Sequence, residues 1–275
     1  MNAEIDFGEW LSRVRRERPL VHGIFGPVVA GRVADALLAV GASPVMARAP
    51  EEVADVARGA GAVTLSLGML DAQSLAAMLA AGQAAGGAGV PVVFDPVGVG
   101  ATAYRAEAAA RLAAQLRLAV LRGNRGEIGW MLGTGGRVRG VDAVTGGAGL
   151  EAAMQAWARS RASVVVATGA VDLVADGTRV LRLGNGDPVL AAVAGTGCQL
   201  TALIGAWTAV AGPRPALARV AEAAAAAITS FNVAAELARE VARGPGSFPA
   251  ALLDALWDLT GERVARRARV EILQV

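Results

Sequence analysis

Short apolar runs alternate with longer helical stretches, and this alternation constrains the fold more than any other feature of the chain. The runs are rich in Val, Leu or Ile and mostly free of charge, as parallel strands covered on both faces are. We expect strands at Leu20–Ile24, Val63–Leu67, Val92–Asp95, Ala119–Arg122 and Ser163–Thr168. Between them we expect helices at Val28–Val40, Glu51–Arg58, Ala72–Ala85, Arg105–Leu116 and Leu150–Arg161. This order predicts an α/β fold.

The pattern changes in the last third of the chain. Val171–Ala175 and Arg179–Leu183 flank Asp176-Gly177, which favours an antiparallel hairpin. Alanine-rich helices are expected next, roughly at Gln199–Ala211, Arg214–Arg243 and Pro249–Leu259, with a final strand near Val270–Leu273. Because no linker or repeat interrupts the 275 residues, we expect one domain over residues 1–275. Its sheet would be mixed and mainly parallel, with helices on both faces.

Charge and cysteine content exclude several classes of protein. The 26 basic residues, all arginine, nearly balance 24 acidic ones, so no strong footprint for nucleic acid is expected. We interpret the arginines of Arg13–Arg18 and Arg263–Arg269 as solvated helix faces and a lead into the last strand. The one cysteine, Cys198, excludes an internal disulfide, and the one histidine, His22, excludes a multi-histidine metal site.

We expect no membrane span and a cytoplasmic location. The uncharged segment Pro188–Pro213 is long enough to cross a bilayer, but Gly195, Thr196, Gly197 and Gln199 interrupt it. A buried loop and helix is the better interpretation. The N-terminal residues mix acidic and basic side chains and lack the apolar stretch of a signal peptide.

Two turns carry charged side chains where expected strands end, and in such folds ligands bind beyond those ends. In the first, Asp95 precedes the turn Pro96–Gly100 and could hold Mg²⁺ while backbone amides approach a phosphate; it could equally cap a helix. In the second, Arg122 offers a bidentate phosphate clamp. Glu127 lies on the first turn of the following helix, where it could also complete a capping box with Asn124.

Two further turns complete the set of candidates. Thr168-Gly169 could touch a nucleotide, although ordinary turn chemistry explains the pair equally well. Gly195-Thr196-Gly197-Cys198 opens a helix, so its amides form an anion hole, and the helix field predicts a lowered pKa for the Cys198 thiol. The alternative is that Cys198 is a small core residue. Since the chain has no lysine for a Walker A loop, Asp95, Glu127, Arg122 and the amide cradle together indicate phosphoryl transfer by positioning and charge neutralisation.

These motifs, taken in order, resemble the hydroxyethylthiazole kinase family of the ribokinase-like superfamily. The resemblance runs from about Leu20 to Leu259 and rests on Gly41–Met46, Asp95–Thr102, Arg122–Ile128, Thr168–Gly177 and Gly195–Cys198. It implies a three-layer ribokinase-like fold that uses ATP and Mg²⁺. The implied reaction transfers the γ-phosphate to the hydroxyl of 4-methyl-5-(2-hydroxyethyl)thiazole, in a homotrimer with active sites between subunits.

The resemblance also implies roles for individual residues. Arg122 and Thr168 would contact ATP, the amide of Gly197 would help to hold the γ-phosphate, and Asp95 and Glu127 would organise Mg²⁺. Met46, Gly195 and Gly26 would line the thiazole pocket. Cys198 would position the acceptor hydroxyl and could accept its proton.

Departures from the family pattern cluster on the acceptor side. Phe25-Gly26 stands where threonine and asparagine are usual, and Gly31 and Asp35 replace further asparagines. Ser66-Leu67-Gly68-Met69 replaces an Asn-x-Gly-Thr turn, and Ala194 replaces a threonine. A kinase of another small alcohol, or a non-catalytic nucleotide- or thiazole-binding homologue, therefore stays open. If the thiazole is the acceptor, Gly26→Asn is expected to improve its use.

Overall fold

A nine-stranded sheet organises the computed structural model, which describes residues 5–135, 137–139, 142–145, 149–212 and 214–273. Its order is β11-β10-β9-β8-β5-β4-β3-β1-β2. The strands are β1 (Leu20–Ile24), β2 (Ser43–Val45), β3 (Ala62–Ser66), β4 (Val92–Asp95), β5 (Val120–Asn124), β8 (Val164–Thr168), β9 (Asp172–Ala175), β10 (Val180–Leu183) and β11 (Val270–Leu273). A separate two-stranded sheet pairs β6 (Arg137–Arg139) with β7 (Asp142–Thr145).

The strands from β2 to β8 in this order are parallel, and β9, β10 and β11 extend that sheet as antiparallel strands. The order reverses at β1, because the chain goes outward to β2 and then returns to β3 on the other side of β1. Parallel strands present their carboxyl ends at one edge, and a reversal there opens a crevice between neighbouring strand ends. The ends of β1 and β3 flank this switch point.

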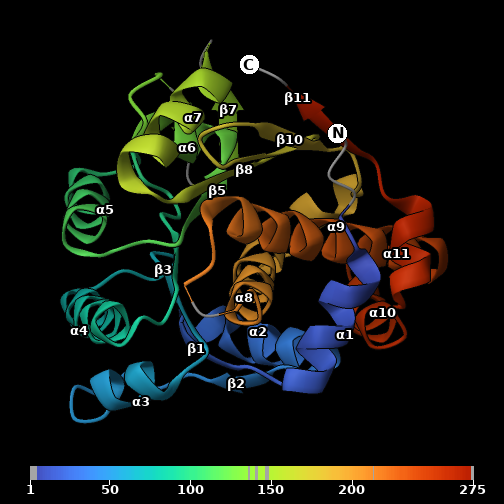
Figure 1. The fold of residues 1–275 in the computed structure, drawn as a ribbon, viewed down its shortest axis with the longest axis horizontal. Helices are drawn as coiled ribbons and strands as arrows, with labels where there is room; N and C mark the ends of the chain where they lie inside the picture. Colours follow the sequence, from blue (N-terminus) through green and yellow to red (C-terminus); the bar gives the residue numbers. More distant parts are fainter. Residues whose placement is uncertain (1–4, 136, 140–141, 146–148, 213, 274–275) are drawn as a thin grey trace.

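Helices cover both faces of the sheet (Figure 1). The helices on one face are α3 (Val53–Gly59), α4 (Ala72–Ala88), α5 (Ala103–Gln115), α6 (Arg125–Met131) and α7 (Leu150–Arg161). The other face carries α1 (Phe7–Glu17), α2 (Pro27–Ala39), α8 (Thr196–Ala209), α9 (Leu217–Val241), α10 (Phe248–Trp257) and α11 (Gly261–Arg267). Two apolar clusters follow this division, one on each face. The expected three-layer α/β architecture is confirmed.

Local sequence signals set several helix boundaries near the strand ends. Asp71 and Ser74 form a capping box that starts α4, and the helix ends at Gly89 in the left-handed region. Thr102 caps α5 by accepting a hydrogen bond from the Arg105 amide. Asp95 is therefore not the cap of the helix that follows it.

The expected strands and the antiparallel hairpin are confirmed, with boundaries shifted by a few residues at most. Sequence analysis did not predict β2, β6, β7, α1, α11 or the short 3₁₀ helix at Pro188–Ala192. All of these except α1 have between three and seven residues, too few to show a periodic pattern. In α1 the buried Phe7, Trp10, Leu11 and Val14 follow helical spacing, so this helix could have been predicted from the sequence. The structure has α9 at Leu217–Val241, shorter than the helix expected at Arg214–Arg243. Pro213, which ends the uncharged segment 188–213, lies outside the described residues.

Helix α9 is the one described helix that is long and apolar enough to cross a membrane, and 83% of its most apolar window is buried. It lies across the sheet, packed against α8 and α10 (Figure 1). Its alanines permit this close packing on several sides. The burial identifies α9 as a core helix of this fold.

Candidate active site

The carboxyl ends of β4, β5 and β8 lie side by side and bring Asp95, Arg122 and Thr168 into contact. Arg122 Nη1 donates to Asp95 Oδ2 at 3.1 Å, and its Nη2 donates to Thr168 Oγ1, also at 3.1 Å. The sheet register causes this meeting, since Asn124 pairs with Thr168 and β4 pairs with β5. The guanidinium is thus fixed at the edge of the sheet by two partners from neighbouring strands.

Asp95 is almost fully buried, with 1% of its surface exposed, yet only one of its oxygens is satisfied by the protein. Oδ2 accepts hydrogen bonds from Arg122 and from Thr201 Oγ1, the latter at 2.8 Å. Oδ1 is buried without a hydrogen-bond partner, as is Arg122 Nε. Burial raises the pKa of Asp95, and the Arg122 charge opposes that shift. Since buried polar groups normally have hydrogen-bond partners, these two neighbouring atoms leave bonding capacity that a ligand can use.

Glu127 is held by both of its oxygens at the start of α6. Oε2 accepts from the Asn124 amide at 2.8 Å while Asn124 Oδ1 accepts from the Glu127 amide, which confirms the expected capping box. Oε1 accepts at 2.7 Å from the amide of Gly98, in the turn after Asp95. Burial and the neighbouring charge of Asp95 raise the pKa of Glu127 to about 7. The structure therefore places two carboxylates in one electrostatic environment.

This donor set fits Mg²⁺ better than a metal held entirely by protein. Among the described residues there is no group of three or more His, Cys, Asp or Glu side chains that could hold a metal ion. Mg²⁺ is commonly bound by one or two carboxylates together with water and substrate phosphates. Asp95, with its free Oδ1, and Glu127 meet that requirement, and Arg122 beside them suits a phosphate.

The start of α8 lies against Arg122. Gly195 is the N-cap of α8, with a φ of 91° that favours glycine. A Cβ atom on Gly197 would lie 3.1 Å from Arg122 Nη1, so the absence of a side chain at position 197 leaves space for the guanidinium. The glycine-rich turn of the sequence therefore brings the start of α8 close to the guanidinium of Arg122 in β5.

Cys198 follows in the same turn, but its expected acidity is not found. Its Sγ lies 3.9 Å from Ser66 Oγ, at the end of β3. Burial and the nearby charge of Asp95 raise the pKa of the thiol to about 12. The expectation that the helix start lowers this pKa is wrong, because loss of solvation and a neighbouring carboxylate outweigh the helix field. Cys198 is a neutral thiol at neutral pH.

The residues expected on the acceptor side lie at the ends of β1 and β2. Gly26 is the N-cap of α2, and Met46 directly follows β2. A Cβ atom on Gly26 would lie 2.6 Å from Met69 Cγ and 2.8 Å from Met69 Cβ. Asparagine at position 26 would collide with the base of the Met69 side chain, so the prediction that Gly26→Asn alone improves the site needs correction.

Two positioning contacts were not predicted from the sequence. Thr201, whose hydroxyl donates a hydrogen bond to Asp95, lies one helical turn after Gly197, and this spacing puts both residues on one face of α8. Arg105 donates to the carbonyls of Leu67 and Val97, joining the turns that follow β3 and β4. By contrast, His22 is buried in β1, where its Nε2 contacts the Ala47 carbonyl at 2.6 Å, and burial lowers its pKa.

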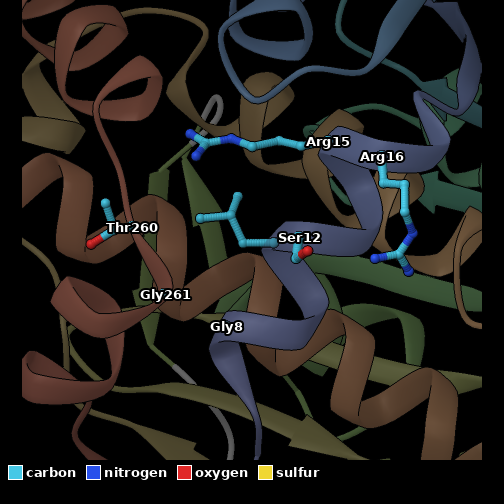
Figure 2. Close-up of a pocket in the computed structure, with 7 residues that line it drawn as sticks. Gly8, Ser12, Arg15, Arg16, Thr260 and Gly261 are labelled. Atoms are coloured by element: carbon cyan, nitrogen blue, oxygen red, sulfur yellow. The ribbon is translucent and has the colours of Figure 1, made fainter.

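An open hollow of about 500 Å³ lies elsewhere, between α1 and α11. Figure 2 shows Arg15 and Arg16 extending from α1 in different directions beside Thr260 and Gly261. Arg15 is engaged with the carbonyl of Trp257 at 2.9 Å. None of the candidate site residues lines this hollow, so it is separate from the strand-end site.

Comparison with known proteins agrees with the geometry of the strand ends. Residues 11–262 match the hydroxyethylthiazole kinase family. The chain belongs to this family. A hydroxyethylthiazole kinase from Desulforudis audaxviator is 48% identical over 98% of this chain and 96% of its own length. One from Moorella thermoacetica is 46% identical over 95% of this chain and 96% of its own length.

Two solved structures share the fold of this chain. A structure of hydroxyethylthiazole kinase protein from Pyrococcus horikoshii matches with a TM-score of 0.86 and 39% identity, covering 97% of this chain and 98% of that one. A pyridoxal kinase from Staphylococcus aureus matches with a TM-score of 0.62 at 16% identity, covering 94% of this chain and 99% of that one. The second likeness shows the fold alone, and the expected ribokinase-like fold is thereby confirmed.

Proposed function

We propose that the protein transfers the γ-phosphate of ATP to the primary hydroxyl of 4-methyl-5-(2-hydroxyethyl)thiazole. The observation that carries this proposal is the contact of Arg122 with Asp95 and Thr168 at three adjacent strand ends, beside the start of α8, in a member of the hydroxyethylthiazole kinase family. Phosphoryl transfer depends on positioning and charge neutralisation, which this arrangement supplies.

On the donor side, Arg122 and Thr168 hold the ATP phosphates, together with the amides of Gly195 to Cys198. Asp95 and Glu127 hold Mg²⁺, which neutralises phosphate charge when bound. Two features support this assignment: the unpartnered Oδ1 of Asp95 and the space that Gly197 leaves beside Arg122. Thr201 keeps Asp95 in position through its 2.8 Å hydrogen bond.

On the acceptor side, Gly26, Met46 and Gly195 line the thiazole pocket, and Cys198 positions the acceptor hydroxyl. A new bond forms between the hydroxyl oxygen and the γ-phosphorus as the bond to the β-phosphate oxygen of ADP breaks. The hydroxyl proton is released in the same process. Because the pKa of Cys198 is raised to about 12, its neutral thiol suits hydrogen bonding to the acceptor better than removal of that proton.

The proposal is tested by following ADP release with Mg-ATP and a panel of small alcohols that includes the thiazole and pyridoxine. The expected result is rapid ADP formation with the thiazole and none when Mg²⁺ is chelated. ADP release with another alcohol, but not with the thiazole, would show that the other alcohol is the acceptor. Binding of ATP without transfer to any alcohol would leave a non-catalytic homologue.

We also propose that the chain acts as one kinase domain in the cytoplasm and assembles as a homotrimer with active sites between subunits. The continuous nine-stranded sheet supports the single domain. Large apolar side chains that are exposed near the strand ends, Val28 and Met69 among them, support an interface there. Light scattering should give a mass three times 27.7 kDa, whereas a single-chain mass would contradict the trimer.

A further inference from the structure

The acceptor end of the site lies at the switch point of the sheet. Strands β3, β1 and β2 are neighbours, so the segments that leave them are contiguous along the carboxyl edge. These segments contain Ser66–Met69, Phe25-Gly26 and Met46, respectively. Ser66 lies 3.9 Å from Cys198, which ties this edge to the start of α8. An acceptor hydroxyl beside Cys198 would therefore lie near the end of β3, next to the ends of β1 and β2 in the sheet order.

Met69 occupies the space that a side chain at position 26 would need. A Cβ on Gly26 would meet Met69 Cγ at 2.6 Å, Cβ at 2.8 Å and Sδ at 2.9 Å. Gly26 has a φ of −64°, which any residue adopts, so its backbone does not require glycine. The contact with Met69 is therefore what keeps this position free of a side chain.

Gly23, in β1, also lacks space for a side chain. A Cβ on Gly23 would lie 2.7 Å from the ring of Phe25 and 2.9 Å from Met46 Sδ. The Phe25 ring and the Met46 thioether therefore fill the space beside Gly23. Phe25 is buried, whereas 50% of the Met69 surface is exposed. Phe25 follows β1, and Met46 and Met69 follow β2 and β3, the two strands that flank β1; we name these three side chains the thioether–phenyl wall.

We propose that Met69 is a specificity-determining residue of the acceptor site, where it replaces a side chain at position 26 and completes the thioether–phenyl wall. This inference rests on the proposed function. Thioethers and phenyl rings are polarisable and offer no strong hydrogen-bond donor. Such a wall favours a flat, methyl-bearing heteroaromatic ring over an acceptor with several hydroxyls, which would leave polar groups unpaired against it.

The test uses matched variants of the whole chain. Met69→Ala removes the thioether, Met69→Leu keeps its volume, and Gly26→Ala pushes against Met69. The double variant Gly26→Ala/Met69→Ala relieves that collision. Leu38→Ala is the control, because Leu38 is similarly exposed, at 52%, near the end of α2. Calorimetry gives the Kd for the thiazole alcohol, and steady-state kinetics gives kcat and the two KM values.

Met69→Ala should raise the Kd and KM for the thiazole about tenfold and leave the KM for Mg-ATP unchanged. It should also lower the preference for the thiazole over pyridoxine. Met69→Leu, which keeps the volume of the side chain but not its sulfur, should weaken thiazole binding less than Met69→Ala does. The control Leu38→Ala should stay within about twofold of wild type. Gly26→Ala should raise the Kd for the thiazole. The factor by which the double variant raises this Kd should be smaller than the product of the factors for the two single variants.

The outcomes separate the two proposals. An unchanged thiazole Kd in Met69→Ala, or a double variant whose loss equals that product, would overturn the role of Met69. Wild-type protein that binds the thiazole without forming ADP would overturn the proposed reaction, and the Kd series would still decide the role of Met69. Wild-type protein that neither binds nor phosphorylates the thiazole would overturn both.

Discussion

Different interactions hold the two ends of the proposed site, which we call the phosphate end and the acceptor end after the roles proposed for them. At the phosphate end, Asp95, Arg122 and Glu127 are buried charged groups fixed by hydrogen bonds of 2.7–3.1 Å to neighbouring strands and turns. At the acceptor end, Gly26 and Met69 meet through van der Waals contact alone, and half of Met69 is exposed. Charge and hydrogen-bond geometry define one end, and volume defines the other.

This difference has a consequence for substitution. A buried hydrogen-bonded charge loses several partners when it is replaced, so the phosphate end tolerates little change. A contact between apolar volumes can be rebuilt by a paired change, as at positions 26 and 69. We expect the reaction type to depend on the phosphate end and the choice of acceptor to depend on the other.

The largest effect is expected from Asp95→Asn. The change removes the negative charge beside Arg122 and replaces one carboxylate oxygen of Asp95 with an NH₂ group, which cannot bind Mg²⁺. Turnover should fall about 10³-fold, measured as ADP release over a range of Mg²⁺ concentrations. Asp258→Asn, at an exposed position after α10, is the matched control and should keep full activity. Comparable turnover in the two variants would refute a catalytic role for Asp95.

The next effect concerns stability at the edge of the phosphate end. Asp172 accepts from the Gly169 amide at 2.9 Å and from Asn232 at 2.7 Å, and burial raises its pKa to about 6. The carboxyl group of Asp172 therefore binds a proton more tightly in the native state than in the unfolded state. For this reason the protein loses stability as Asp172 ionises, between about pH 4 and about pH 6.

Asp172→Asn cannot titrate and provides the comparison. The unfolding free energy of wild type, relative to this variant, should fall by about 3 kcal/mol between about pH 4 and pH 7. Urea unfolding at a series of pH values measures this difference. A difference that stays constant with pH would contradict a raised pKa at Asp172.

Cys198 lies where the two ends meet, so Cys198→Ala tests both. Turnover should fall about 100-fold because the acceptor hydroxyl loses its positioning group, while the thermal midpoint should change little. Cys198→Ser, which keeps a donor of similar size, should retain more activity than the alanine variant. Unchanged turnover in Cys198→Ala would remove Cys198 from the mechanism.

The smallest effect is expected from Gly197→Ala. Its Cβ would lie 3.1 Å from Arg122 Nη1, and Arg122 cannot retreat without loosening its bonds to Asp95 and Thr168. The KM for Mg-ATP should rise about tenfold with the thiazole KM unchanged. A rise in the thiazole KM instead would place Gly197 at the acceptor end.

Sequence patterns predicted that Asp95, Arg122 and Thr168 lie together, because all three stand in or at the ends of neighbouring apolar strands. Asp95 and Thr168 end β4 and β8, and Arg122 lies in β5 between them, two residues before its end, so parallel pairing alone brings them together. The capping box of Asn124 and Glu127 was also visible as a local pattern. Thr201 was missed because its partner, Asp95, is far away in the sequence, and such a contact exists only after α8 packs on the sheet.

The acceptor end was less predictable because its contacts also depend on tertiary structure. The contact between Gly26 and Met69 joins turns after different strands, and no local pattern reports which volume fills a space left by glycine. The pKa of Cys198 was predicted in the wrong direction because burial and the charge of Asp95 depend on tertiary structure. Local sequence predicts chemistry at a strand end better than it predicts the shape of a pocket.

Phosphorus NMR of the purified protein with Mg-ATP, with and without 4-methyl-5-(2-hydroxyethyl)thiazole, tests the central claim most directly. A new phosphomonoester signal that requires both the protein and the thiazole is the predicted result, and Asp95→Asn should abolish it. ATP that stays intact in the presence of the thiazole, in a sample that phosphorylates another alcohol, would contradict the account of the acceptor end.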